Sequence, residues 1–457
     1  METPLTKTFI VGGGGPNGLY LALELLRHNA DCRVIVAEKR AVQVRRQVLA
    51  IGFNTAVNLP EKVKEALWDK GHRETLFAVQ DKTNRGIFPK FTHIKYAPFM
   101  CIAHFQEVLL KYLESNYPGR FGYIHHDMSM CARGTIATAD CIKLLEVARP
   151  VLPDLFCGSL GEVAFFSATG GGSPSRKLWD AAQSGSPYEF QHHGIIVNFQ
   201  SPTGAETYMR NGEPVVMGLV GKTGILPACA NNPGHFDVQL YTTAAPGSYL
   251  TEHDAGWSKL SESLRQRMKY RGGQPSLTLA NGADLLENDA DKAWFKAYAS
   301  AIVKACRDWN IALPDLSKVT VNYAERGEYY FDKAALHLQG ETEKYPAFYV
   351  GDASGGTDWS GYGVSLSRGL ESSTFLASLI HRVGLDHAVG EYNTFWEDVI
   401  IKEFNLPSGE QGKYVVPHYK YRIKGRSYRD KGGKIVTYTE DKFFEWVKEK
   451  KCIDIGC

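Results

Sequence analysis

Three glycines and one acidic residue near the start of the chain have the types and spacing to bind a dinucleotide. Gly13, Gly15 and Gly18 form the pattern G-x-G-x-x-G, and Glu38 follows them. In such a unit the first glycine permits a tight turn, the second lets the backbone approach a pyrophosphate, and the third lets a helix pack on the sheet. A carboxylate at the place of Glu38 accepts hydrogen bonds from ribose hydroxyls. This segment alone fits either FAD or NAD.

The segments around these residues have the order that a dinucleotide-binding βαβ unit requires. Apolar residues 9–11 precede the glycines and residues 34–36 precede Glu38, as expected of two strands. Pro16 suits the first turn of a helix, where free N–H groups can face phosphates. Four apolar residues recur at the spacing of a helix with one buried face: Leu19, Ala22, Leu23 and Leu26.

A second candidate site lies far along the chain. Residues 348–350 read as a strand that runs into Gly351-Asp352 and a loop of small residues. After Gly361-x-Gly363, apolar residues at helical spacing predict a helix. The N-terminus of such a helix stabilises negative charge placed near it, such as that of a reduced flavin.

Taken together, these two motifs resemble the class A flavoprotein monooxygenases of the para-hydroxybenzoate hydroxylase type. The resemblance covers residues 8–185 and 320–395. It implies that FAD is the dinucleotide, that Asp352 binds its ribityl chain, and that the helix after Gly363 points at the flavin pyrimidine.

Two further segments resemble cofactor-binding parts of related enzymes. Residues 44–50 are similar to a stretch of MICAL-type monooxygenase domains in which an arginine contacts the flavin cofactor; Arg45 is the match and Arg46 the second choice. In the helix expected over residues 102–113, the resemblance implies Gln106, or else His104, at the FAD phosphate or ribose.

Residues 165–176 stand where the family carries its Asp-Gly motif, with Thr169 at the usual aspartate position. No catalytic acid or base is predicted, but Trp359 and Tyr362 are expected near the isoalloxazine. The residues predicted to bind the cofactor are Gly13, Gly15, Pro16, Asn17, Gly18, Glu38, Lys39, Arg45, Gln106, Gly351, Asp352, Gly361 and Gly363.

The implied fold class is α/β, with a Rossmann-like FAD-binding domain around a central parallel sheet, interleaved with a β-sheet substrate domain. The expected domains are FAD-binding residues 1–70, 100–185 and 320–398, substrate-binding residues 71–99 and 186–319, and a C-terminal extension, 399–457. Residues rich in β-branched side chains predict strands at 194–199, 215–220 and 319–323, with helices near 258–269, 290–307 and 440–450.

Composition narrows the class of protein. The chain has 457 residues, 44% of them hydrophobic, and a net charge of +2, so it resembles a globular protein without a field that favours nucleic acid or acidic membranes. No long apolar run predicts a membrane span, and the first strand leaves no room for a signal peptide. Nine scattered cysteines without a C-x-x-C pair suit reduced thiols. We therefore expect a cytoplasmic protein.

Two patterns receive the simpler interpretation. Adjacent residues on a strand point to opposite faces, so neither His125-His126-Asp127 nor His192-His193 predicts a metal site. Tyrosines alternate with lysines and arginines over residues 413–434, as in some nucleic-acid surfaces, but such alternation is more typical of a strand with one packed face. We expect neither a metal nor a nucleic-acid partner.

Three functions stay open at this stage. The resemblance implies an FAD-dependent monooxygenase, or hydroxylase, in which NADPH or NADH reduces the flavin. O2 then forms a C4a-hydroperoxide that oxygenates an aromatic or other electron-rich small molecule. The alternatives are an FAD-dependent oxidase or dehydrogenase on the same fold, and a non-catalytic FAD-binding scaffold.

Overall fold

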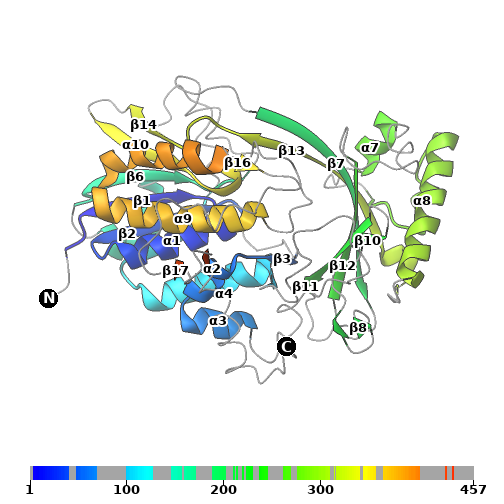
Figure 1. Ribbon diagram of the computed structural model, residues 1–457, viewed down its shortest axis with the longest axis horizontal. Coiled ribbons are helices and arrows are strands. Elements are labelled where there is room, and N and C mark those ends of the chain that lie inside the picture. The colour runs from blue at the N-terminus through cyan, green and yellow to red at the C-terminus, as the bar shows by residue number, and fades with distance from the viewer. Residues whose placement is uncertain are drawn as a thin grey trace.

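The computed structural model describes most of the two sheets and the helices that pack on them. The described residues are 4–40, 48–68, 99–126, 146–156, 159–170, 188–201, 209–210, 213–214, 219–220, 223–229, 236–244, 261–268, 275–308, 313, 315–339, 343–356, 364–401, 428–429 and 435–436. In these parts the chain forms two six-stranded sheets, each with helices on it (Figure 1).

The first sheet is mostly parallel and carries the predicted dinucleotide site. Its strands, in spatial order, are β14 (Ala335–Gln339), β15 (Lys344–Tyr349), β6 (Glu162–Ser167), β1 (Lys7–Gly12), β2 (Cys32–Glu38) and β5 (Phe121–His125). All neighbours pair in parallel except β14 and β15. The carboxyl ends of five strands therefore lie along one edge, where ligands bind in sheets of this kind.

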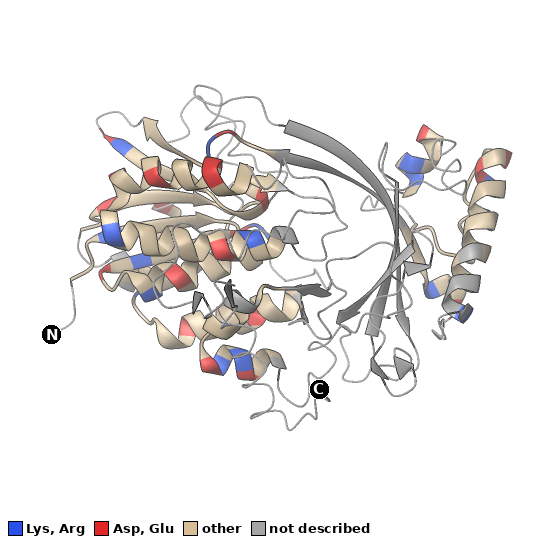
Figure 2. Cartoon of the chain, viewed as in Figure 1, with Lys and Arg blue, Asp and Glu red and all other residues tan. Residues whose placement is uncertain are grey.

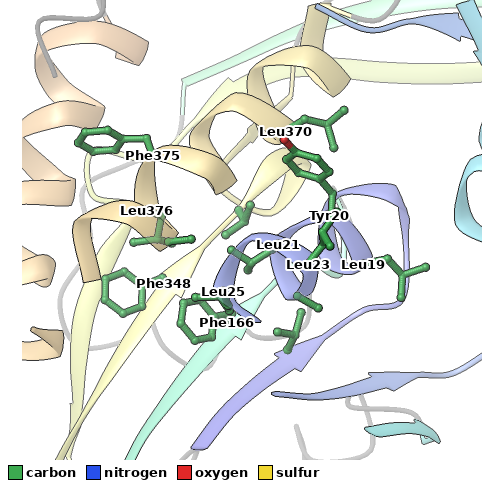
Figure 3. Packing of buried hydrophobic residues seen from close by; sticks show 14 of the residues in the cluster. Leu19, Tyr20, Leu21, Leu23, Leu25, Phe166, Phe348, Leu370, Phe375 and Leu376 are labelled. Atoms are coloured by element: carbon green, nitrogen blue, oxygen red, sulfur yellow. The ribbon is translucent and has the colours of Figure 1, made fainter. Parts of the chain in front are cut away.

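Helices that come from distant parts of the chain pack on the first sheet. They are α1 (Pro16–His28), α2 (Phe53–Asn58), α3 (Glu61–Trp68), α4 (Ile102–Asn116), α9 (Val364–Val383), α10 (Leu385–Phe395) and a π-helix, Trp396–Ile401. In the core of this unit, Leu21, Leu23 and Leu25 of α1 lie among apolar side chains of the sheet and of α9 (Figure 3).

Helix α1 is more deeply buried than the sequence predicts. The spacing of its leucines indicates one buried face, but every residue from Gly18 to Leu26 is buried. The reason is that α9 and α4 cover the sides of α1 that do not face the sheet. In α9 the four apolar residues expected on one side are buried, namely Leu366, Leu370, Ala377 and Ile380, but so is every residue from 368 to 380, so that this stretch of α9 is also buried on all sides.

The second sheet is antiparallel. In spatial order its strands are β10 (Leu219–Val220), β11 (Thr223–Cys229), β12 (Phe236–Ala244), β7 (Tyr188–Ser201), β13 (Thr320–Tyr330) and β16 (Gly355–Gly356). Two helices, α7 (Glu262–Met268) and α8 (Asp289–Asp308), pack beside its curved strands (Figure 1). The apolar core there joins Leu264 and Phe295 of the helices to Val321 of β13.

Short elements complete the described chain. Three two-stranded pairs are β3 (Val48–Ala50) with β4 (Phe99–Cys101), β8 (Met209–Arg210) with β9 (Glu213–Pro214), and β17 (Tyr428–Arg429) with β18 (Ile435–Val436). Three 3-10 helices are η4 (Pro153–Phe156), η8 (Leu316–Lys318) and η9 (Gly351–Ala353).

The two sheets meet at the second predicted motif. The last residue of strand β13, Tyr330, pairs with Gly355 of β16. Strand β16 follows the 3-10 helix η9, which contains Asp352. Beyond β13, the Phe331 N–H donates to the Ser354 carbonyl at 3.1 Å. The edge of the antiparallel sheet is therefore joined directly to the carboxyl end of β15.

The predicted fold class is confirmed: the protein is α/β with a central, mostly parallel sheet. The predicted strands at 194–199 and 319–323 fall within β7 and at the start of β13, and the helices near 258–269 and 290–307 contain α7 and match α8. Within 215–220 only β10 is described, and the helix expected at 440–450 lies outside the described residues. The domain boundaries stay a prediction.

The charges and apolar residues of the described helices do not indicate a further property of the fold. Figure 2 shows basic and acidic residues interspersed along most helices of the described chain, whereas α10 carries only the acidic residues Asp386 and Glu391. None of the described helices combines the length and apolar character needed to cross a bilayer.

Candidate functional site

Gly13 and Gly18 are glycines because the protein's own backbone occupies the space beside them. Gly13 has a φ of +103°, and a Cβ built on it would lie 2.6 Å from the Ala168 carbonyl oxygen. A Cβ at Gly18 would lie 1.9 Å from the Gly13 oxygen. The loop after β1 is thus packed tightly between the start of α1 and the loop after β6, which is the role that the pattern predicts for these two positions.

Gly15 differs, because no atom of the described chain lies within 4 Å of a Cβ built there. Gly15 is the N-cap of α1 and Pro16 follows it in the first turn, as predicted. The first N–H groups of a helix have no partner within the helix. Among the three glycines of the G-x-G-x-x-G pattern, Gly15 is therefore the one with open space in the described chain. It lies at the positive end of a helix, where a phosphate is stabilised.

Glu38 is buried at the end of β2 and is held in place by backbone groups. The Gly14 N–H donates to Glu38 Oε2 at 2.7 Å, and the Arg40 N–H donates to Oε1 at 3.0 Å. Each carboxylate oxygen can accept more than one hydrogen bond. The carboxylate is therefore already oriented beside the glycine loop, with capacity for ribose hydroxyls. Lys39, also predicted to bind the cofactor, is exposed.

The structure separates the two candidates on α4. Gln106 is buried, and its Nε2 donates to the Gly14 carbonyl oxygen at 2.9 Å. His104 instead lies 3.1 Å from the Ala66 carbonyl of α3. Gln106 is thus the residue at the glycine loop, although its contact within the protein is with the loop backbone. Its contact with a cofactor stays a prediction.

Tyr123 and His125 of β5 belong to the same region and were not predicted. Tyr123 lies beside Gly14, since a Cβ at Gly14 would be 2.8 Å from Tyr123 Oη. His125 Nδ1 lies 3.0 Å from the Glu38 carbonyl oxygen. Glu38 and His125 are register partners on neighbouring strands, and residues two apart on a strand share a face. That alternation would have been the only sequence signal for Tyr123.

The loop after β6 brings Thr169 to the same edge of the sheet. The Ala168 N–H donates to the Gly12 carbonyl at 2.7 Å, and the Ser167 carbonyl accepts from the Val350 N–H at 2.9 Å. The hydroxyls of Ser167 and Thr169 are 3.3 Å apart. These bonds join the ends of β1, β6 and β15, so Thr169 lies between the two predicted motifs.

Asn17 makes the direct contact between the two motifs. A Cβ built on Gly351 would lie 2.1 Å from Asn17 Nδ2, and one on Gly369 of α9 would lie 2.5 Å from Asn17 Oδ1. Gly351 has a φ of +61°, which also favours glycine. The adjacent Asp352 is half-buried at this junction. The structure therefore brings together seven of the predicted residues, and their contact with a cofactor stays a prediction: Gly13, Gly15, Asn17, Gly18, Glu38, Gly351 and Asp352.

Helices α1 and α9 begin at the same end of the molecule. Their contacts run in the same order along both helices: Asn17 with Gly369, Tyr20 with Thr374, and Asn29 with Ala377. The two helices are therefore parallel. Their N-termini both carry partial positive charge, so the end where Gly15 is open favours an anionic ligand.

Two buried charged residues near the start of α9 escaped the sequence analysis. Arg368 and Glu371 are both buried, and they are three residues apart on one helix. A Cβ at Gly52, before α2, would lie 2.7 Å from Glu371 Oε1. The sequence signal that could have identified Arg368 and Glu371 is a pair of opposite charges three residues apart in a helix of small and apolar residues.

Several predicted residues lie outside the described part of the chain. These are Arg45 and its alternative Arg46, and Trp359, Gly361, Tyr362 and Gly363. Their roles, and the local similarity to MICAL-type domains, stay predictions.

No protein-family model matches the chain, and no curated protein sequence matches it. The chain is similar to solved structures, however. CtdE in complex with FAD and substrate 4 is 12% identical with a TM-score of 0.49, over 87% of this chain and 86% of that one. p-Nitrophenol 4-monooxygenase PnpA from Pseudomonas putida DLL-E4 is 12% identical with a TM-score of 0.47, over 90% and 88%.

Klebsiella pneumoniae HpxO, complexed with FAD and uric acid, is 14% identical with a TM-score of 0.46, over 88% of both chains. At these identities the similarity concerns the fold, and the functional proposal below depends on the residues of this chain.

Proposed function

We propose that this protein binds FAD across the starts of α1 and α9 and acts as an FAD-dependent monooxygenase. The observation that carries the proposal is the contrast between Gly15 and its neighbours. Protein atoms occupy the places of side chains at Gly13, Gly14 and Gly18, whereas no atom of the described residues occupies the place at Gly15. An open position at a helix start, beside a buried carboxylate, suits the pyrophosphate and ribose of a dinucleotide.

The described residues fit FAD at both ends. The first turn of α1 would hold the pyrophosphate, Glu38 the adenosine ribose, and Asp352 the ribityl chain. Asn17 Oδ1 is buried and has no hydrogen-bond partner within the described residues. It lies between the two halves, where a bound ligand could supply a donor. These features support a ligand that spans from β2 to β15.

When bound, FAD would supply the redox chemistry, with NADPH or NADH as the reductant and O2 as the oxidant. The chain's own contribution is position and field. The parallel starts of α1 and α9 would stabilise negative charge along the cofactor. The edge strand β16 of the second sheet begins at Gly355, three residues after Asp352, and so this sheet is suited to cover a small electron-rich substrate beside the flavin.

The binding proposal is tested by a substitution that the fold tolerates. Gly15 has a φ of −67° and open space, so Gly15→Ala should leave the unfolding temperature unchanged. We expect FAD to bind about tenfold or more weakly, because a methyl group would stand where the pyrophosphate approaches the backbone. The measurement is FAD titration followed by flavin fluorescence and absorbance.

The matched control is Gly390→Ala on α10, which also has open space around the added Cβ but is not at the site. It should bind FAD as the wild type does. A wild-type protein without flavin absorbance and without FAD affinity would refute the proposed cofactor. Equal FAD affinity in Gly15→Ala would refute its proposed position.

The oxygenase activity is tested separately. The FAD-loaded protein should consume NADPH or NADH faster in the presence of a suitable aromatic compound, and ¹⁸O₂ should label the product. Stopped-flow reduction with each nicotinamide identifies the reductant. A product that carries no label from ¹⁸O₂ would favour an oxidase or dehydrogenase instead.

A further inference from the structure

Gly14, the variable position between the first two glycines of the pattern, is held by three side chains from three elements. Glu38 of β2 accepts its N–H at 2.7 Å, and Gln106 of α4 donates to its carbonyl oxygen at 2.9 Å. The third is Tyr123 of β5, whose Oη and Cε2 would lie 2.8 and 3.0 Å from a Cβ at Gly14. Both the N–H and the carbonyl group of Gly14 thus form hydrogen bonds. The ring of Tyr123 occupies the space that a side chain at Gly14 would take.

We propose that Glu38, Gln106 and Tyr123 form a clamp on Gly14 that presets the adenosine end of the cofactor site. The inference rests on the proposed function, because it concerns the same site. It assigns Tyr123 a role that the motif does not contain, and it makes Gly14 a required glycine. Gln106 and Tyr123 are positioning residues in this scheme, since they act through Gly14 and Glu38.

The location of Gly14 explains why the clamp matters. Gly14 directly precedes Gly15, so any movement of its peptide groups moves the open position at the start of α1. The same movement breaks the bond that orients Glu38. Both hydrogen bonds are buried, and hydrogen bonds are stronger in such surroundings than in water. A loop that is ordered before binding loses less entropy when the ligand arrives.

The part of the site that the clamp presets should bind a ligand of one chemical class. The members of the clamp lie around the residues proposed for the pyrophosphate and the adenosine ribose, and all come from β2, β5, α4 and the loop after β1. The fragment recognised there is adenosine 5′-diphosphate. ADP alone should therefore bind to the flavin-free protein, and loss of the clamp should weaken ADP and FAD by the same factor.

The experiment compares Tyr123→Leu and Gln106→Met with the wild type. For each we expect FAD and ADP to bind about fivefold to tenfold more weakly, the range expected for one lost contact. The absorption spectrum of bound flavin should not change, because the clamp is at the other end of the cofactor. The measurements are fluorescence titration with FAD, competition with ADP, and thermal unfolding of the flavin-free protein.

Tyr117→Leu is the matched control. Tyr117 is also partly buried, and its ring packs against Tyr112 and the guanidinium of Arg120 rather than against Gly14. It should lower the unfolding temperature without a change in the affinity for ADP. Tyr123→Phe, which keeps the ring, should retain most of the affinity and serves if Tyr123→Leu does not fold.

A pair of substitutions isolates the steric contact. Gly14→Ala should impair binding of both ligands, and addition of Tyr123→Leu should restore part of it, because two of the three nearest atoms to the new Cβ belong to Tyr123. If FAD binds the wild type while ADP affinity is unchanged in Gln106→Met and, where it folds, in Tyr123→Leu, the clamp is overturned alone. If the wild type binds neither FAD nor ADP, the proposed function is overturned with it.

Discussion

At the scale of single residues, the glycines of one short loop have different physical reasons to be glycine. Gly13 and Gly18 are surrounded by backbone, Gly14 by side chains, and Gly15 by open space. The sequence pattern assigns different roles to Gly13, Gly15 and Gly18. Within the described chain, Gly15 is the one of these three that leaves room for a ligand. Substitution at each position should therefore have a different result.

Gly18→Ala should prevent normal folding of the loop. The added Cβ would lie 1.9 Å from the Gly13 carbonyl oxygen, and neither backbone segment can move without loss of the contact between α1 and the sheet. We expect a loss of about 3 kcal/mol or more in the free energy of unfolding. Urea unfolding measures it, with Gly15→Ala as the tolerated counterpart. Wild-type stability in Gly18→Ala would contradict the packing described here.

Cys32 should be unreactive in the folded protein. Burial raises the pKa of its thiol to about 12, so the nucleophilic thiolate is scarce at pH 8. Because this pKa lies above the unfolded value of 9.0, the stability that Cys32 contributes is present below pH 9 and is lost as the pH rises from about 9 toward about 12.

Iodoacetamide at pH 8, followed by mass spectrometry of the Cys32 peptide, checks this prediction. Modification should be slow in buffer and fast in urea. Similar rates in both solutions would show that the thiol is accessible in the fold.

At the scale of elements, the pair α1 and α9 is the feature that joins the two motifs. A polar seam, defined by Asn17 and Tyr20 of α1 and by Asn29, the residue that caps its C-terminus, contacts α9 along most of the length of α1. Tyr20, the middle residue of the seam, lies among apolar residues of α1 and α9 (Figure 3). Apolar packing alone would allow one helix to slide along the other, whereas hydrogen bonds at specified positions fix the register.

Tyr20→Phe should weaken this seam. Its buried hydroxyl lies 3.0 Å from Thr374 Oγ1, and Phe keeps the ring in the core. We expect the free energy of unfolding to fall by about 1 kcal/mol. Thr374→Val and the double substitution complete a cycle, measured by urea unfolding. Additive effects of the two substitutions would show that the hydroxyls do not interact; Tyr112→Phe on α4 is the control.

At the scale of the whole molecule, the chain returns from the second sheet to the first through a short segment that α10 holds in place. Asn393 Oδ1 accepts the N–H groups of Ala334 and Ala335, both at 2.9 Å, and its Nδ2 donates to the Ala335 carbonyl at 2.8 Å. Trp396 Nε1 donates to the Phe331 carbonyl at 2.6 Å. These bonds set where β13 ends relative to Asp352.

Asn393→Ala should loosen this return. Three backbone groups would lose their partner at once, and an unsatisfied buried group costs about 1–3 kcal/mol. We expect a loss of about 2 kcal/mol in the free energy of unfolding and weaker FAD binding, because the turn at Asp352 is joined to the same segment. The control is Thr394→Ala, an exposed neighbour. Equal stability of the two variants would contradict this role.

Much of the first motif could be predicted because it is local. Gly13 to Glu38 form one continuous βαβ unit, in which chain connection alone places the helix start and the acid near each other. Residues contributed by other segments were harder to predict. Gln106 was assigned by resemblance, Tyr123 was missed, and the deep burial of α1 was underestimated because α9 lies more than 300 residues further along the chain.

The sequence by itself determined the βαβ unit, because periodicity and glycine spacing express local backbone geometry. The fold class and the return of Asp352 to this unit were expected from the family resemblance. Only the tertiary structure decided that Asn17 contacts Gly351 and Gly369, and that two strands and a helix supply the side chains around Gly14. Those facts depend on how distant segments fill space around one another. Close packing is a property of the folded molecule, and no local pattern records it.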